Sequence, residues 1–134
     1  MAKPRLSTFT FTKLVVDDLE KMAGFYGSVY QLDQITRMSD AVGGDAIEEI
    51  ILGTAGALTP GALILLRYVD RPRPPGGEVI LGFTTNDLPA LLELVKKAGG
   101  SVHAPIKEMP ELKIRVAFAT DPEGHLAELV QVQA

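Results

Sequence analysis

The stretch AFATDPEGHLAELVQ, residues 117–131, consists of two apolar runs separated by Asp-Pro-Glu-Gly. Proline fixes its φ angle and glycine tolerates a positive one, so these residues predict a tight turn between two strands. Glu128 lies inside the second apolar run, where burying an unpaired carboxylate costs several kcal/mol. The partner of Glu128 is therefore the first question for any functional site.

The same order of elements is predicted twice along the chain. Each half begins with a strand and a helix that starts near an Asp-Leu pair, and three short strands follow. The expected elements of the first half are a strand at 7–16, a helix to about residue 30, and strands at 33–37, 48–52 and 61–69. Those of the second half are a strand at 79–85, a helix that ends at Gly99 and Gly100, and strands at 101–104, 114–120 and 125–132.

The two halves align with a fixed offset. Val-Asp-Asp-Leu at 16–19 aligns with Thr-Asn-Asp-Leu at 85–88, which lies 69 positions further on. A unit that cannot bury its sheet alone is expected to share a core with its copy. We expect a single domain over 1–134, with module one at 7–70, a proline-rich linker at 71–77 and module two at 78–132.

The composition argues against several classes of partner. The formal net charge of the 134 residues is -4, and the 13 Lys and Arg residues are scattered, so nucleic acid is not an expected partner. The chain has no cysteine, which agrees with a reducing compartment. No apolar run approaches the roughly 20 residues of a membrane span, and no signal-peptide pattern begins the chain. We expect a soluble cytoplasmic protein that binds neither nucleic acid nor membrane.

Three segments resemble the vicinal oxygen chelate superfamily, also called the glyoxalase, bleomycin-resistance and extradiol dioxygenase family. They are KLVVDDLEKMAGFYGSVYQL at 13–32, LGFTTNDLPALLELVKKAGGSV at 81–102 and VAFATDPEGHLAELVQ at 116–131. The resemblance implies an α+β fold in which two βαβββ modules form a cup-shaped mixed sheet. It also implies a homodimer, with exchanged modules in some members.

Members of this family that use a metal place His, Gln or Glu at four positions on the concave face of the cup. By resemblance, these positions fall on Phe11, Leu65, Ile80 and Glu128. Phe, Leu and Ile have no atom that binds a cation, and a single carboxylate holds a divalent ion only weakly. We therefore expect neither a metal nor another cofactor.

Strand alternation adds neighbours to these positions, because residues two or four apart share a face. Lys13, Arg67 and Thr84 are the polar or charged neighbours. A mostly apolar pocket with a few polar groups is typical of a small-molecule site. The predicted ligand-binding residues are Phe11, Lys13, Leu65, Arg67, Ile80, Thr84 and Glu128.

Glu128 has three interpretations at this point. It forms an ion pair with Lys13 or Arg67, it acts as a general acid or base in a dry pocket, or it is a solvated carboxylate with no role. His125 is interpreted as an exposed turn residue. The segment 38–59 is interpreted either as a mobile lid over the pocket or as a plain connection.

Two functional hypotheses follow. The first is a binding protein whose metal-free apolar cup takes a small molecule that is aromatic or carries a carbonyl or carboxylate group. The apolar residues at three of the four metal positions favour this hypothesis. The second is a lyase or isomerase in which Glu128 moves a proton while Lys13 or Arg67 stabilises an oxyanion.

Overall fold

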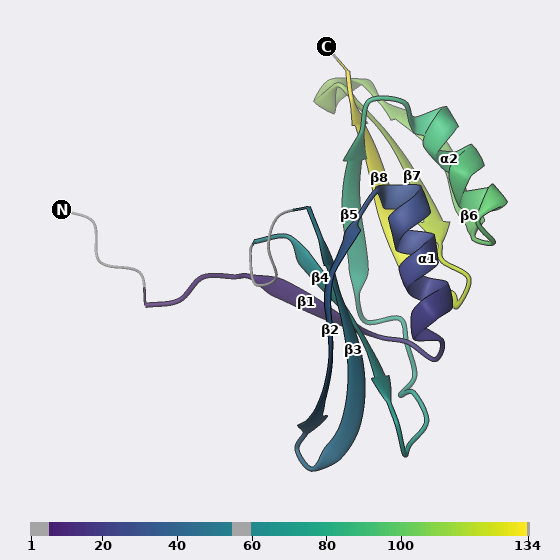
Figure 1. The fold of residues 1–134 in the computed structure, drawn as a ribbon. Helices are drawn as coiled ribbons and strands as arrows, with labels where there is room; N and C mark the ends of the chain where they lie inside the picture. The colour runs from purple at the N-terminus through teal and green to yellow at the C-terminus, as the bar shows by residue number, and fades with distance from the viewer. Residues whose placement is uncertain (1–5, 55–59, 134) are drawn as a thin grey trace.

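The computed structural model describes residues 6–54 and 60–133 (Figure 1). This part of the chain forms two four-stranded mixed sheets, two α-helices and a short 3-10 helix, η1 (Pro110–Leu112). Module one contains β1 (Phe11–Val15), α1 (Leu19–Tyr30), β2 (Asp33–Val42), β3 (Asp45–Gly53) and β4 (Ala62–Tyr68). Module two contains β5 (Ile80–Thr85), α2 (Leu88–Lys97), β6 (Ser101–Met109), β7 (Ile114–Thr120) and β8 (Leu126–Val132).

The two modules have the same topology. The strand order is β1-β4-β3-β2 in the sheet of module one, called sheet A, and β5-β8-β7-β6 in the sheet of module two, called sheet B. In each sheet the first strand of the module runs parallel to the last, and the other neighbours are antiparallel. The predicted α+β class and the two βαβββ modules are confirmed.

Each helix begins at the aspartate that the sequence indicates. The side chain of Asp18 accepts a hydrogen bond from the N–H of Lys21 at 3.0 Å, and that of Asp87 accepts one from Ala90 at 3.1 Å. These caps satisfy amide groups that no carbonyl of the helix reaches. The two Asp-Leu pairs therefore mark the same event in both modules, the turn from the first strand into the helix.

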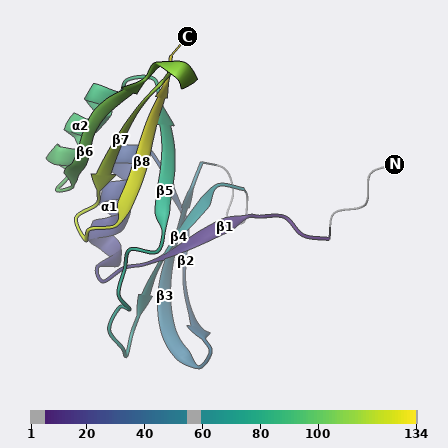
Figure 2. The same ribbon diagram turned by 180° about the vertical axis from the view of Figure 1, so that it is seen from behind.

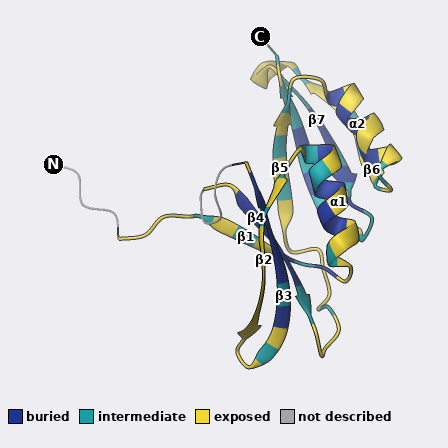
Figure 3. Ribbon diagram, in the orientation of Figure 1, coloured by how far each residue is buried: buried dark blue, intermediate teal, exposed yellow. Residues whose placement is uncertain are grey.

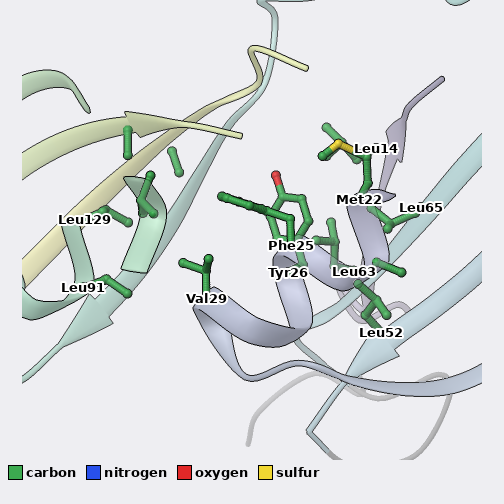
Figure 4. Close-up of a cluster of buried hydrophobic side chains, with 14 of the residues drawn as sticks. Leu14, Met22, Phe25, Tyr26, Val29, Leu52, Leu63, Leu65, Leu91 and Leu129 are labelled. Carbon is green, nitrogen blue, oxygen red and sulfur yellow. The ribbon is translucent and has the colours of Figure 1, made fainter. Parts of the chain in front are cut away.

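Both sheets pack against one shared core, and α1 lies between them (Figure 4). On one side of α1, Met22 lies with Leu65 of sheet A. On the other side, Phe25 and Val29 face Leu129 of sheet B. Each helix packs on the sheet of its own module, α1 on sheet A and α2 on sheet B, and the buried residues of both modules form one cluster, which agrees with the expectation that the repeat shares a core.

The junction between α1 and module two is closely packed. The ring of Tyr30 stacks on that of Phe83, with centroids 3.8 Å apart. A Cβ at Gly100, in the turn after α2, would overlap the carbonyl oxygen of Thr120 and lie 3.1 Å from the ring of Phe25. Only glycine therefore allows α1 and this turn to approach so closely.

The structure corrects the interpretation of residues 38–53. They belong to a hairpin of β2 and β3, which Gly43 and Gly44 join with positive φ angles. These residues are therefore neither a lid nor a plain connection, and residues 55–59 of the expected segment lie outside the described part of the chain. The strand β2 is exposed along nearly its whole length (Figure 3), so its polar sequence lacks the alternation of a half-buried strand.

The predicted strand at 101–104 is too short, since β6 continues to Met109 with an irregular register against β7. Residues 69–79 contain no helix or strand, and the expected linker at 71–77 lies among them. No helix in the described residues has the length and apolar character needed to cross a membrane.

Gly100→Ala is expected to lower the free energy of unfolding by about 2–3 kcal/mol, because the added methyl group must displace the backbone of Thr120. Gly24→Ala is the matched control, since Gly24 lies on the exposed side of α1 and an added Cβ there meets nothing within 4 Å. That variant is expected to be more stable by about 0.5–1 kcal/mol. Urea denaturation measures both, and a neutral effect of Gly100→Ala would contradict the packing of this junction.

Candidate functional site

Each sheet has one face against the shared core and one face turned away from it, here called the open face. Figure 2 shows sheet B with both helices behind it, so that its open face is toward the viewer. On sheet A, Leu65 belongs to the core, whereas Lys13 and Ile64, which pair across β1 and β4, lie on the open face. Strand alternation and register place Phe11 and Glu49 on this open face as well.

Two predicted site residues lie on the opposite face. Leu65 is fully buried in the core, and Arg67, two residues further along β4, binds Glu48 on the same side. The prediction that they share a face with Phe11 is wrong. The strand β4 begins Ala-Leu-Ile-Leu-Leu, which is apolar on both faces, so alternation cannot assign a side. Ile64 holds the open-face position instead.

On sheet B, Glu128 lies on the open face. It pairs laterally with Gly82 of β5 and with Phe118 of β7. The half-buried side chain of Glu128 lines a cavity of about 530 Å³ over β6, β7 and β8. Glu128 and Lys107 are the charged residues of this cavity, and its other lining residues, which include Phe118 and Val116, are apolar.

The other predicted residues line different hollows. Phe11 and Ile80 meet in a cavity of about 560 Å³ between β1 and β5. Lys13 lines a smaller cavity of about 180 Å³ between β1 and the linker. Thr84 is exposed near the far end of β5. Within one chain, the predicted residues therefore do not converge on a single pocket.

Glu128 forms no ion pair with any residue that the structure describes. The ammonium of Lys13 lies 2.7 Å from Oε2 of Glu49, and Arg67 binds Glu48. The predicted ion pair of Glu128 with either cation is therefore wrong. Its carboxylate lines the cavity without a charge partner from this part of the chain.

The residues at the expected metal positions do not fit a metal. At these four positions the open faces present Phe11, Ile64, Ile80 and Glu128, and of these four side chains only Glu128 carries a donor atom. Ile64 rather than Leu65 is the counterpart of Glu128, because it pairs with β1 as Glu128 pairs with β5. Among residues 6–54 and 60–133, no group of three His, Cys, Asp or Glu side chains could hold an ion.

His125 is not an exposed turn residue, because it is nearly buried in a hydrogen-bond network that joins the modules. Its Nδ1 lies 2.8 Å from Oδ2 of Asp121, and its Nε2 lies 3.0 Å from the carbonyl oxygen of Val15 in β1. The hydroxyl of Tyr26 in α1 donates to the same Asp121 oxygen at 2.8 Å. The turn at 121–124 of module two is thereby fixed to β1 and α1 of module one.

The network favours a protonated imidazole beside a carboxylate. The two nearest partners of the His125 ring, Asp121 and the carbonyl oxygen of Val15, are acceptors, whereas the charge of Arg73 near Nε2 opposes protonation. The hydrogen bond to Asp121 raises the pKa of His125 above its ordinary 6.5, and burial opposes this only in part. For Asp121, burial acts to raise the pKa. The hydrogen bonds and the charge of His125 outweigh this effect, so the pKa of Asp121 lies below its usual value. Burial beside Asp121 raises the pKa of Tyr26, so its hydroxyl stays protonated.

Two further residues extend this junction. The carboxylate of Glu123 accepts hydrogen bonds from the N–H groups of Asp17 and Asp18, both at 2.9 Å. Arg73 of the linker donates to Asp17 at 3.1 Å and lies 3.4 Å from Nε2 of His125. The motif Asp-Pro-Glu-Gly-His contains three of the junction residues, but turn formation alone explains such a motif. Their partners lie about a hundred positions earlier, and no sequence spacing links them.

Two βαβββ modules arranged in this way define the glyoxalase-like fold, which several solved structures share. A glyoxalase family protein from Bacillus cereus matches with a TM-score of 0.83 and 18% identity, over 100% of this chain and 99% of that one. Glyoxalase I from Zea mays matches with a TM-score of 0.75 and 23% identity, over 90% of this chain and 44% of the maize chain. The chain therefore spans less than half of the maize protein. At these identities, the likeness shows the fold alone.

The chain belongs to the Glyoxalase/Bleomycin resistance protein/Dioxygenase superfamily. The model of that family matches residues 8–129, which include both modules. The resemblance that the three sequence segments indicate is thus confirmed at the level of the family. A search of curated proteins found no match to the chain.

His125→Gln is expected to lower the free energy of unfolding by about 1–3 kcal/mol at pH 6 and by less at pH 9. The folded-state pKa of His125 lies above 6.5, so its contribution is complete below pH 6.5 and is lost as the pH rises through the folded value. His103→Gln, at an exposed histidine of β6, is the control and should have little effect at either pH. Denaturation at both pH values measures this, and a penalty independent of pH would contradict the charged form of His125.

Proposed function

We propose that the protein binds a small, largely apolar molecule on the open face of module two, without a metal. The molecule is aromatic or carries a carbonyl or carboxylate group. The observation that carries this proposal is the cavity of about 530 Å³ beside Glu128, whose walls are apolar except for Glu128 and Lys107. Small-molecule sites have volumes of roughly 300–1,000 Å³ and a few polar groups that orient the ligand. The absence of cysteine agrees with a cytoplasmic setting.

A second copy of the chain completes this site in our proposal. Both sheets turn one face to the shared core, so the two open faces of one chain lie on the outer sides of that core. In the described residues, β1 and β5 each pair on one side only. Phe9, Phe11, Val79 and Ile80 are exposed at these edges. A homodimer that covers these edges would bring the open face of module one from one copy beside that of module two from the other.

An enzyme of the lyase or isomerase type is the second candidate, and one observation favours it. Glu128 lines an apolar cavity and has no charge partner in the described residues, which leaves its carboxylate able to exchange a proton with a ligand. Glu128→Gln separates the two candidates in an assay of aromatic aldehydes and ketones. If the unaltered chain converts a substrate and Glu128→Gln does not, the protein is an enzyme. If both proteins bind the compounds and neither converts them, it is a binding protein.

Phe118→Ser is expected to weaken binding of the fluorescent apolar probe N-phenyl-1-naphthylamine by about 10–100-fold, because the phenyl wall of the cavity is lost. Phe118 lies outside the shared core, so the variant should fold. Leu94→Ser, at an exposed leucine of α2 outside this cavity, is the control and should bind the probe as the unaltered chain does. Fluorescence titration measures the affinities. Equal affinity of folded Phe118→Ser and the unaltered chain would overturn the proposed site.

A further inference from the structure

Glu49 is a buried carboxylate on the open face of module one. It is 4% exposed, and it and Asp121 are the buried charged side chains among the residues that the structure describes. Ile47 and Ile51, two residues away on either side in β3, are also buried, as is Leu66, with which Glu49 pairs. The carboxylate therefore lies in the middle of an apolar surface.

The repeat shows that this carboxylate is particular to module one. Glu49 pairs with Leu66 of β4, and at the corresponding place in sheet B Val116 of β7 pairs with Val130 of β8. Val116 is apolar and lines the cavity beside Glu128. Glu49 on β3 is the buried carboxylate of the open face in module one, and Glu128 on β8 is the half-buried carboxylate of the open face in module two.

The surroundings of Glu49 differ from those of the other buried acid. Asp121 accepts hydrogen bonds from a tyrosine hydroxyl, an imidazole and two backbone N–H groups. Oε2 of Glu49 lies 2.7 Å from the ammonium of Lys13, and this oxygen has no further hydrogen-bond partner among the described residues. A buried ion pair with so few hydrogen bonds contributes little stability compared with apolar residues of the same size. Its presence here points to a role toward a ligand.

Lys13 offers the donors for such a role. Its side chain is 38% exposed, and its ammonium lies 5.9 Å from the ring centroid of Phe11 on the same open face. An ammonium has three N–H donors, and Glu49 engages one side of it. The cavity of about 180 Å³ beside Lys13, whose lining also includes Arg73, Glu78 and His125, has room for a small polar group of a ligand.

We propose that Glu49 determines specificity by holding and neutralising Lys13, so that this face binds the carbonyl oxygen of a neutral apolar molecule rather than an anion. The paired ammonium still donates hydrogen bonds, but the adjacent carboxylate cancels most of its attraction for a negative charge. A neutral ketone, aldehyde or quinone matches a hydrogen-bond donor whose charge is compensated and which lies beside the ring of Phe11. The inference rests on the proposed function, since it names the class of ligand for the completed site.

Two pairs of probes test this inference on the full chain. The first pair is N-phenyl-1-naphthylamine and its sulfonated form, 8-anilinonaphthalene-1-sulfonate, which differ by one negative charge. The unaltered chain is expected to prefer the neutral probe. Glu49→Gln leaves the charge of Lys13 uncompensated and should shift the ratio of the two affinities about tenfold toward the sulfonate. Glu48→Gln, at the neighbouring acid on the opposite face, is the control and should leave the ratio unchanged.

The second pair is 2-acetylnaphthalene and 2-ethylnaphthalene, which differ by the carbonyl oxygen. The unaltered chain should prefer the ketone several-fold, and the double variant Lys13→Met with Glu49→Leu should lose this preference while it keeps its fold. An unchanged charge ratio in Glu49→Gln, or a ketone preference retained in the double variant, would overturn the role of Glu49. If the unaltered chain bound none of the four probes, the proposed function itself would fail.

Discussion

The burial of α1 between the two sheets is the constraint on which the rest of the structure depends. Sheet A packs against α1 and sheet B against α2, and α1 also contacts α2 and stacks Tyr30 on Phe83 of sheet B, so that one core joins the two modules. The opposite faces of both sheets are turned away from this core, and in our proposal they receive a ligand and a second copy of the chain. Glu49 and Glu128 lie on these open faces because their neighbours along each strand point into the core.

A polar junction supports the same arrangement at the edge of the core. The turn after β7 supplies Asp121 and His125, which bind Tyr26 of α1 and the carbonyl oxygen of Val15. Such a network fixes one orientation of the modules more strictly than apolar contacts do, since each buried polar group has few alternative partners. It also makes that orientation sensitive to a rise in pH, because the histidine, whose pKa is raised above 6.5 by Asp121, loses its proton as the pH passes that raised value.

Local and repeated features could be predicted from the sequence. Features that depend on which residues meet in the folded chain could not. The Asp-Leu helix starts, the turn before His125 and the offset of 69 positions are local signals, and the fold follows from them. The sequence could not show which face of β4 lies against the core, because an apolar run without alternation is the same on both faces. The prediction therefore put Leu65 on the open face, whereas it lies in the core. The charge partners were also beyond reach, since Lys13 meets Glu49 across the intervening strand β4.

Native mass spectrometry of the full chain, purified without chelator and without a metal-affinity column, tests the central claim most directly. The claim is that two copies form a small-molecule site whose residues do not recruit a metal. The account predicts a species of twice the 14.4 kDa chain with no retained divalent ion. A single chain, or one divalent ion retained per chain, would contradict it.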